Sequence, residues 1–324
     1  MAIVSGDFTS FAAIGNREDL RDMIFDITPT ETVFMASVGK GVAKATRHEW
    51  QTDSLASAAN NNQLEGDTYT FSTPDATTRL ANSTTISRKT LSVSETQDAV
   101  SKAGRAREYA YQLVKRTKEL KLDMETTLTG NQTPVPADNG ASTTVARQLR
   151  PLCGWYSTND DRGTSGSDGT STAAATDGTQ RELDEIMFKR VIRLCINAGG
   201  MPDTIMVGTY NKQVISTFTG NVTKTQNVAP DGGGRGPVTL VTNIDFYRSD
   251  WGTHKIVFNR RQRARDVHVL DTEFWEVAYL RPMKVVDLAK TADSTEGAVR
   301  AEYTLVSKNQ AASGVIADTN INNL

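Results

Sequence analysis

The chain has 324 residues, of which 38% are hydrophobic and 23% are charged, and its formal net charge is -2. These values are typical of globular proteins, and the length predicts about two domains. The nearly balanced charge gives no general attraction for nucleic acid or for a membrane surface, and no apolar run reaches the roughly 18 residues that span a bilayer.

The N-terminus has no basic segment followed by an apolar block, so no secretory signal is expected. The two cysteines, Cys153 and Cys195, are 42 residues apart. A zinc site usually has closer pairs and more Cys or His, so we expect two reduced thiols in a cytoplasmic product.

The first 45 residues predict an extended arm with a short helix within 16–27. Residues 46–95 predict a long β-hairpin that reaches away from the body. Its ends alternate, with His48 and Trp50 in one strand and Ile86, Leu91 and Val93 in the other. Residues 57–85 are mostly Ala, Asn, Ser and Thr, so we expect this loop to be mobile in the isolated subunit.

A long helix is predicted at about 106–129. Ser94 and Gln97 fit a capping box before it, and Gly130 fits a stop after it. The apolar stripe repeats every three or four residues, so one face packs and the other faces water or another subunit. At about 1.5 Å per residue, such a helix is roughly 36 Å long.

The segment 150–178 is rich in Gly, Ser, Thr and Asp and predicts a mobile surface segment. An α/β layer is predicted next: a helix opened by a capping box from Thr179 to Glu182, a strand at 203–208, and a helix with Thr209 as its N-cap. Short β runs between 238 and 280 predict an antiparallel meander, and 299–309 predicts one more strand.

Catalytic residue types are few. His48, His254 and His268 lie far apart in predicted strands, where packing is the expected role. The glycines at 232–234 lack the G-K-[ST] of a phosphate loop. No spacing favours paired-carboxylate catalysis, although a fold can bring two carboxylates together. We therefore assign no catalytic, cofactor-binding or metal-binding residue.

The strongest charge cluster lies within 259–266. It lacks the interleaved aromatic residues of a single-strand-binding surface, so we expect its guanidinium groups to pair with carboxylates of this chain or of a neighbouring one. The predicted subunit-contact residues are Arg260, Arg261, Arg263, Arg265 and Trp50.

The order of these parts resembles that of tailed-bacteriophage major capsid proteins of the Hong Kong 97-like fold. The helix sequence EYAYQLVKRTKELKLDMETTLTGN (108–131) resembles the spine helix of one branch of these proteins. Residues 48–56, 274–294 and 301–316 also resemble that branch. The resemblance covers most of the chain and implies an α+β fold with an N-terminal arm, an extended loop, a peripheral domain and an axial domain.

The resemblance also implies regions and partners. Residues 1–45 would be the arm, 46–95 the extended loop, 96–150 with 282–324 the peripheral domain, and 151–281 the axial α/β domain. Copies of the chain would form hexamers and pentamers of an icosahedral shell around DNA, assembled in the host cytoplasm. Portal, scaffolding or decoration proteins would be partners, with DNA contacted non-specifically at most, no membrane and no cofactor.

Two further expectations concern maturation. No lysine lies between Lys44 and Lys89, so residues 46–88 of the extended loop have no amine for the lysine–asparagine cross-links of the fold's prototype, and we expect no such cross-links. The residues before the loop lack a long helical stripe, so no cleaved scaffolding segment is expected there. The alternative functions are another virion structural protein, such as a decoration protein or adhesin, and a hydrolase with an undetected site.

Overall fold

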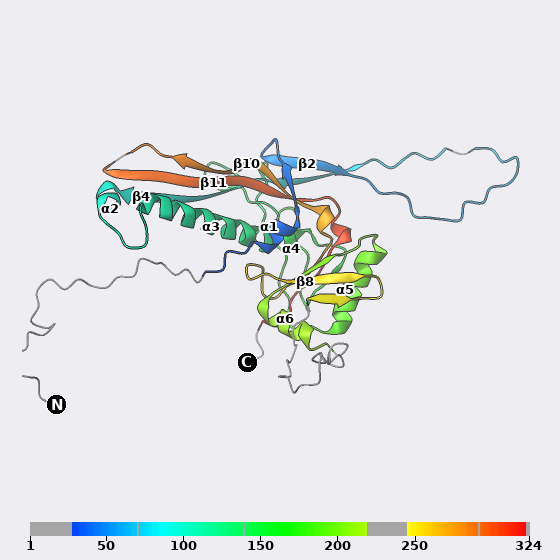
Figure 1. The fold of residues 1–324 in the computed structure, drawn as a ribbon. Helices are drawn as coiled ribbons and strands as arrows, with labels where there is room; N and C mark the ends of the chain where they lie inside the picture. Colours follow the sequence, from blue (N-terminus) through cyan, green and yellow to red (C-terminus); the bar gives the residue numbers. More distant parts are fainter. Residues whose placement is uncertain (1–27, 70, 139, 219–244, 291, 322–324) are drawn as a thin grey trace, which may run out of the picture.

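The protein was examined as a computed structural model, which describes residues 28–69, 71–138, 140–218, 245–290 and 292–321. The helix expected within 16–27, the glycines at 232–234 and the start of the β run from 238 lie outside these residues. The described chain has an elongated upper layer, a compact α/β region below one end of it, and a long loop that projects beyond that end (Figure 1).

The upper layer is a four-stranded sheet. Its order is β1 (Gly39–Val42), β10 (Trp275–Asp287), β11 (Ser294–Ser307) and β4 (Thr85–Ser94). β1 is parallel to β10, and the other pairs are antiparallel. The pairing of β10 with β11 runs from Trp275↔Ser307 to Asp287↔Gly297, with irregular register around Arg281.

The long helix α3 (Glu108–Thr129) lies along this sheet (Figure 1). Its buried Leu120, Met124 and Leu128 join Tyr303 and Leu305 of β11 in one hydrophobic core. The predicted single-stripe helix is thus confirmed. Ser94 also caps a helix, since its side chain accepts from Gln97 N, but that helix is the short α2 (Glu95–Ala99), separate from α3. A further short helix, α1 (Val33–Ser37), brings Phe34 into the same core.

The extended loop starts from a two-stranded sheet of β2 (Arg47–Thr52) and β3 (Thr78–Ser83), paired from Arg47↔Ser83 to Thr52↔Thr78. The first strand was predicted correctly, but the return strand was placed too late. The predicted return residues 86–94 lie in β4, which pairs with β11. Leu91 and Val93 are buried in the body, and this burial outweighs any pairing with β2.

The α/β region contains a six-stranded sheet. Its order is β5 (Asp160–Asp161), β12 (Gly314–Ile316), β9 (Val267–Leu270), β6 (Thr204–Val207), β8 (Thr253–Phe258) and β7 (Phe246–Arg248). Helices α5 (Glu185–Asn197) and α6 (Thr209–Ser216) belong to this region, and two 3-10 turns, η1 (Thr272–Phe274) and η2 (Gln310–Ala312), flank it. The short helix α4 (Leu152–Trp155) contacts α3, and its Leu152 and Trp155 join the core of the upper layer. No helix in the described ranges has the length and apolar character required to cross a membrane.

The antiparallel meander was therefore wrong. The fully buried β6 lies between β8 and β9, parallel to the former and antiparallel to the latter. The predicted capping box at Thr179 was also wrong, because α5 begins at Glu185. Residues near 181 are extended instead, since Arg181 N donates to Asp318 O at 2.8 Å and forms a parallel bridge with Thr319. The N-cap of α6 is Gly208, one residue before Thr209.

Some elements lie outside the expected regional ranges. β10 begins at Trp275, so residues 275–281, expected in 151–281, belong to the four-stranded sheet. β12 belongs to the six-stranded sheet, although 282–324 was expected with the helix α3. Residues 39–42, which were expected in the arm, form the edge strand β1 of the four-stranded sheet. Pairing between residues far apart in sequence decides all three placements.

Candidate functional site

The three histidines lie on different strands and do not come together. His48 is in β2, where its ring centroid lies 5.9 Å from that of Trp50. His254 in β8 is buried, with Nδ1 2.6 Å from Pro202 O and Nε2 2.7 Å from Ser249 Oγ. His268 in β9 is buried and its ring stacks on Tyr156. Packing, the role expected from the sequence, accounts for His48 and His254.

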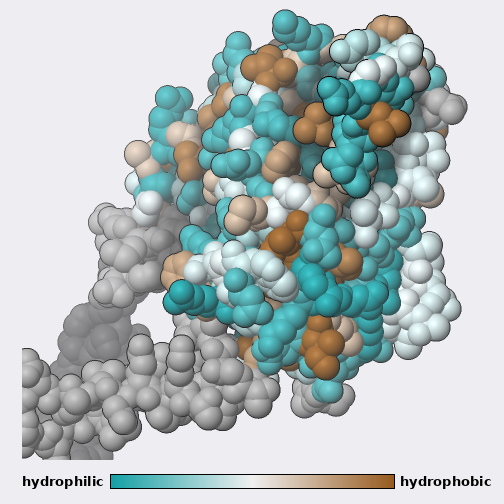
Figure 2. Space-filling view, turned by 90° about the vertical axis from the view of Figure 1, so that its right-hand side faces the viewer, coloured by the Kyte–Doolittle hydropathy of each residue, from teal (hydrophilic) through white to brown (hydrophobic). Residues whose placement is uncertain are grey.

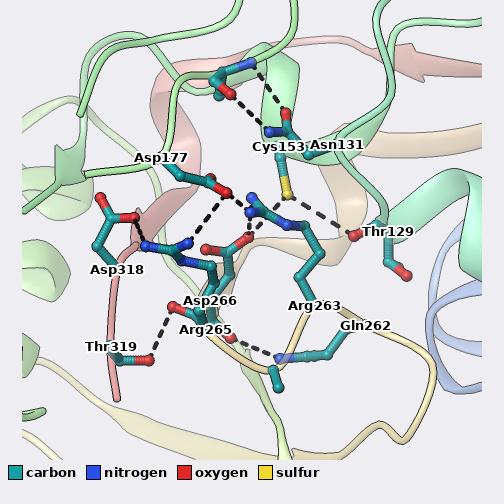
Figure 3. A network of polar contacts seen from close by, with 12 residues as sticks. Thr129, Asn131, Cys153, Asp177, Gln262, Arg263, Arg265, Asp266, Asp318 and Thr319 are labelled. Carbon is teal, nitrogen blue, oxygen red and sulfur yellow. Dashed lines mark hydrogen bonds and ion pairs between the residues drawn. The ribbon is translucent and has the colours of Figure 1, made fainter. Parts of the chain in front are cut away.

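The arginine cluster divides into two pairs. Arg263 and Arg265 point into the molecule and meet three aspartates, a group that we call the arginine junction: Arg263, Arg265, Asp177, Asp266 and Asp318 (Figure 3). Asp177 accepts from both arginines, from Arg263 Nη2 at 2.5 Å and from Arg265 Nη1 at 3.1 Å. Both arginines therefore use partners within their own chain.

The remaining ion pairs of the junction are more deeply buried. Arg263 Nη1 lies 3.0 Å from Asp266 Oδ2, and Arg265 Nη2 lies 2.8 Å from Asp318 Oδ1. Asp266 and Asp318 are each only 1% exposed. Burial alone would lower the pKa of Arg263, but the carboxylates of Asp266 and Asp177 outweigh it and raise that pKa. Charge-assisted bonds of this kind are the strong class of hydrogen bond.

The junction joins segments that are distant in sequence. Arg265 O accepts from Thr319 N at 2.9 Å, and Asn211 Nδ2 donates to Ala264 O and to Thr319 Oγ1. Asp318 has a positive φ of 60°, and its Oδ2 accepts from Gly163 N at 3.1 Å. These contacts hold a backbone conformation that residues other than glycine seldom adopt. The junction thus fixes the C-terminal segment against the α/β sheet.

The segment 150–178 contributes to the same region. The sequence predicted a mobile surface segment, but Leu152, Trp155 and Tyr156 are buried in the main core. Asn131 also forms paired bonds with Ala175, donating from Nδ2 at 2.7 Å and accepting at Oδ1 at 3.0 Å. Most polar residues of this segment lie in loops between these fixed points. The sequence prediction was wrong because the polar composition of the segment outweighed its few apolar residues, which are the buried ones.

A buried carboxylate on α3 was missed in the sequence. Glu125 is fully buried, and it accepts from Phe34 N at 2.6 Å, Met35 N at 2.9 Å and Asn259 Nδ2 at 2.8 Å. Burial raises the pKa of Glu125, although these donors favour the charged form. The only sequence signal was a glutamate beside Met124 on the apolar stripe. Through these hydrogen bonds, the Glu125 carboxylate links α1, α3 and the connection after β8.

The other predicted contact residues have different surroundings. Arg260 is exposed, with its guanidinium 5.2 Å above the ring of Phe258. Arg261 donates from Nη2 to Pro29 O at 3.5 Å. Neither has a carboxylate partner among the described residues. Trp50 donates from its indole nitrogen to Ser307 O at 2.8 Å, and its ring lies 5.7 Å from that of Trp155. Contact of these residues with another subunit stays a prediction.

Large apolar side chains are exposed in the part of the extended loop beyond β2 and β3, residues 53–69 and 71–77. The exposed fractions are 98% for Leu55, 81% for Leu64, 89% for Tyr69 and 97% for Phe71. Figure 2 views the molecule from the side toward which this loop projects, and hydrophobic residues there form small groups among hydrophilic ones. Exposed aromatic residues on a long loop are typical of a surface that another chain covers.

Comparisons with known proteins agree along nearly the whole chain. A family model described as SU10 major capsid protein matches residues 4–320. The major capsid protein of Escherichia phage Phieco32 is 29% identical over 347 residues, covering 95% of this chain and 96% of that protein.

Solved structures with a similar fold share little sequence. The capsid asymmetric unit of Cyanophage A-1(L) has a TM-score of 0.62 at 14% identity, with 96% of this chain and 98% of that chain covered. The capsid of a native GTA particle has a TM-score of 0.60 at 9% identity, with coverages of 96% and 98%. A chain of Gordonia phage Cozz has a TM-score of 0.60 at 9% identity, with coverages of 99% and 98%.

Proposed function

Since this chain belongs to the SU10 major capsid protein family and has the Hong Kong 97-like α+β fold, we propose that it forms hexamers and pentamers that close into an icosahedral shell around phage DNA. The chain is a bacteriophage major capsid protein, a structural component of the virion that assembles with copies of itself. The arrangement into hexamers and pentamers and the enclosure of DNA are the finer proposal.

One observation carries this proposal. The extended loop leaves Leu55, Leu64, Tyr69 and Phe71 at least four-fifths exposed, between β2 and β3, where the described residues form no helix or strand. Burying such side chains contributes about 1.5–3 kcal/mol each. Within one chain this gain is not realised, whereas a neighbouring copy in a shell would supply the missing surface.

The regions would then have different roles. Residues 1–45 would act as the arm, 46–95 as the extended loop, and 96–150 with most of 282–324 as the peripheral domain. The α/β region, formed mainly by residues of 151–281 together with β12, would be the axial domain near the symmetry axis of each capsomer. The helix α3 would serve as a strut, with Leu120, Met124 and Leu128 holding it to the sheet while its opposite face meets the shell interior or a neighbour.

Further partners follow from this role. A portal complex and either a scaffolding or a decoration protein would contact the shell, which would assemble in the host cytoplasm. Packaged DNA would be contacted non-specifically at most, in keeping with the net charge of -2. Arg260 and Arg261 would contact neighbouring subunits, because they have no carboxylate partner in the described chain. Trp50, at the base of the loop, would also lie at a subunit contact.

Electron microscopy of the expressed chain tests the proposal. The chain should yield closed shells with hexamers and pentamers, whereas a decoration protein or adhesin would give only small soluble species. The double variant Tyr69→Ser/Phe71→Ser should stay folded but form at least tenfold fewer shells, because interface aromatics often contribute about 2 kcal/mol or more. The control Ser72→Ala/Thr73→Ser, in the same loop, should assemble normally. Equal shell yields from both variants would contradict the proposed loop contact.

A further inference from the structure

Four polar side chains meet inside the protein between α4 and β9. Cys153 lies in α4 and Tyr156 directly after it, while Asp266 precedes β9 and His268 lies within it. Their exposed fractions are 2%, 0%, 1% and 0%. Cys153 Sγ points toward Asp266 (Figure 3) and lies 3.3 Å from its Oδ2.

Several of these groups lack a hydrogen-bond partner. Within the described parts of the chain, neither ring nitrogen of His268 has one, and the same holds for Asp266 Oδ1 and the Tyr156 hydroxyl. Buried polar groups are nearly always paired, and each exception requires a reason. The contrast with His254 is direct, because both ring nitrogens of that buried histidine have partners within 2.7 Å.

The backbone explains why three ligand types converge here. Asp266 and His268 are two residues apart where the chain enters β9, so their side chains lie on one face of the strand. Cys153 reaches the same place from α4. The ring of Tyr156 stacks on that of His268, with centroids 5.8 Å apart and planes inclined by 23°, and so restrains the imidazole.

One donor atom each from Cys153, Asp266 and His268 lies within 4.8 Å of the other two. Around a tetrahedral zinc ion, with bonds of about 2.0–2.3 Å, ligand atoms are roughly 3.5 Å apart. Side-chain rotations that shift the three ligand atoms by about an ångström would therefore bring them to bonding distance from one ion. A thiolate, an imidazole and a carboxylate are all zinc ligands.

We propose that Cys153, Asp266 and His268 bind a zinc ion that links α4 to β9, with a water molecule in the fourth position. The site does not depend on the proposed shell architecture, because it lies within one chain. On binding, the Sγ–H bond of Cys153 breaks, an Sγ–Zn bond forms and one proton leaves to solvent. The thiolate and the carboxylate then balance the two charges of the ion.

The neighbouring charges are compatible with such an ion. Arg263 and Arg162 are the nearby cations that act on Asp266 and His268, and Arg263 Nη1 donates to Asp266 Oδ2 at 3.0 Å. Arg263 Nη2 keeps Asp177 at 2.5 Å, and Asp266 Oδ1 is available for the metal, so one carboxylate serves both Arg263 and the ion. Among the described residues neither ring nitrogen of His268 is engaged in a hydrogen bond, so the imidazole has a nitrogen open to the ion.

Cobalt substitution of the full-length chain tests the site. The protein is stripped with chelator and titrated with Co²⁺. We expect one equivalent per chain, with visible d–d absorption and a near-ultraviolet thiolate-to-cobalt band. Zinc should displace the cobalt and raise the melting temperature of the stripped protein. Absence of the thiolate band in the folded wild-type chain would overturn the proposal, whatever the behaviour of any variant.

Matched variants identify the ligands. Cys153→Ser should abolish the thiolate band, and His268→Gln should weaken cobalt binding at least tenfold. Cys195→Ser and His254→Gln are controls, because Cys195 is the other buried thiol and His254 a buried histidine with both nitrogens bonded. Both controls should retain the wild-type spectrum. A thiolate band that persists in Cys153→Ser, or disappears only in Cys195→Ser, would exclude this site.

Discussion

The extended loop and the arginine junction reverse the usual distribution of residue types. In the loop, aromatic and aliphatic side chains such as Phe71 are almost fully exposed, whereas the junction buries two aspartates to 1% exposure. The junction pairs its arginines with aspartates of the same chain. The loop satisfies its apolar groups only in contact with something else. We infer that the junction stabilises the folded subunit, while the loop serves assembly. Substitutions in the junction should therefore lower the free energy of unfolding, whereas substitutions in the loop should lower the yield of shells.

The largest loss of subunit stability is expected at the junction. Arg265→Ala removes the partner of Asp318 and leaves a buried, unpaired carboxylate, which typically costs about 3–5 kcal/mol. Denaturant unfolding of the soluble subunit measures this change. The control Arg260→Ala removes a neighbouring but exposed guanidinium and should alter the free energy of unfolding by less than about 0.5 kcal/mol. Equal effects of the two substitutions would remove the distinction between the two arginine pairs.

A smaller or similar loss is expected on α3. Leu120→Ala should reduce the free energy of unfolding by about 2–5 kcal/mol, because Leu120 is fully buried against the four-stranded sheet. Val114 on the same helix is 57% exposed, so Val114→Ala should have little effect on the isolated subunit. Comparable losses at both positions would mean that α3 packs on both faces within one chain.

A pH-dependent contribution is expected from Glu302. Burial alone would raise the pKa of Glu302, but hydrogen bonds from Thr84, Arg281 and Arg147 lower it below 4.5. A lowered pKa in the folded state stabilises the protein above pH 4.5, and the contribution disappears as pH falls through the folded-state value. Glu302→Gln should thus be less stable than wild type at pH 7, by about 1.5–3 kcal/mol. The difference should shrink in acid, and a constant difference from pH 7 to pH 3 would contradict this assignment.

The lowest local stability in the isolated subunit is expected in the loop. Amides of residues 53–69 and 71–77 should exchange with solvent almost unprotected in the isolated subunit, because no described strand or helix includes them. In assembled shells the same amides should become protected. Hydrogen exchange on both states makes the comparison. Strong protection in the monomer would show that the loop folds without a neighbour.

The sequence predicted local features where one periodicity dominated. The stripe from Leu113 to Leu128 specified α3, and the alternation around Leu91 and Val93 indicated a strand, although it was assigned to the hairpin and not to the four-stranded sheet. It also predicted that the arginines of 259–266 would meet carboxylates. It did not predict which carboxylates, because Asp177 and Asp318 lie 86 and 53 residues from their partners. The incorrect prediction of a helix start at Thr179 has the same origin, because the pairing of Arg181 with Thr319 cannot be read from local sequence patterns.

By itself, the sequence thus determined the elements that are stabilised by their own periodicity: the long helix, the alternating strands and an apolar-poor loop. Only the tertiary structure decided the order of strands in the six-stranded sheet, the burial of residues 152–156 within a polar segment, and the meeting of Cys153 with Asp266 and His268. The physical reason is that periodicity specifies which face of an element is buried, whereas partner choice depends on the packing of surfaces that lie far apart along the chain.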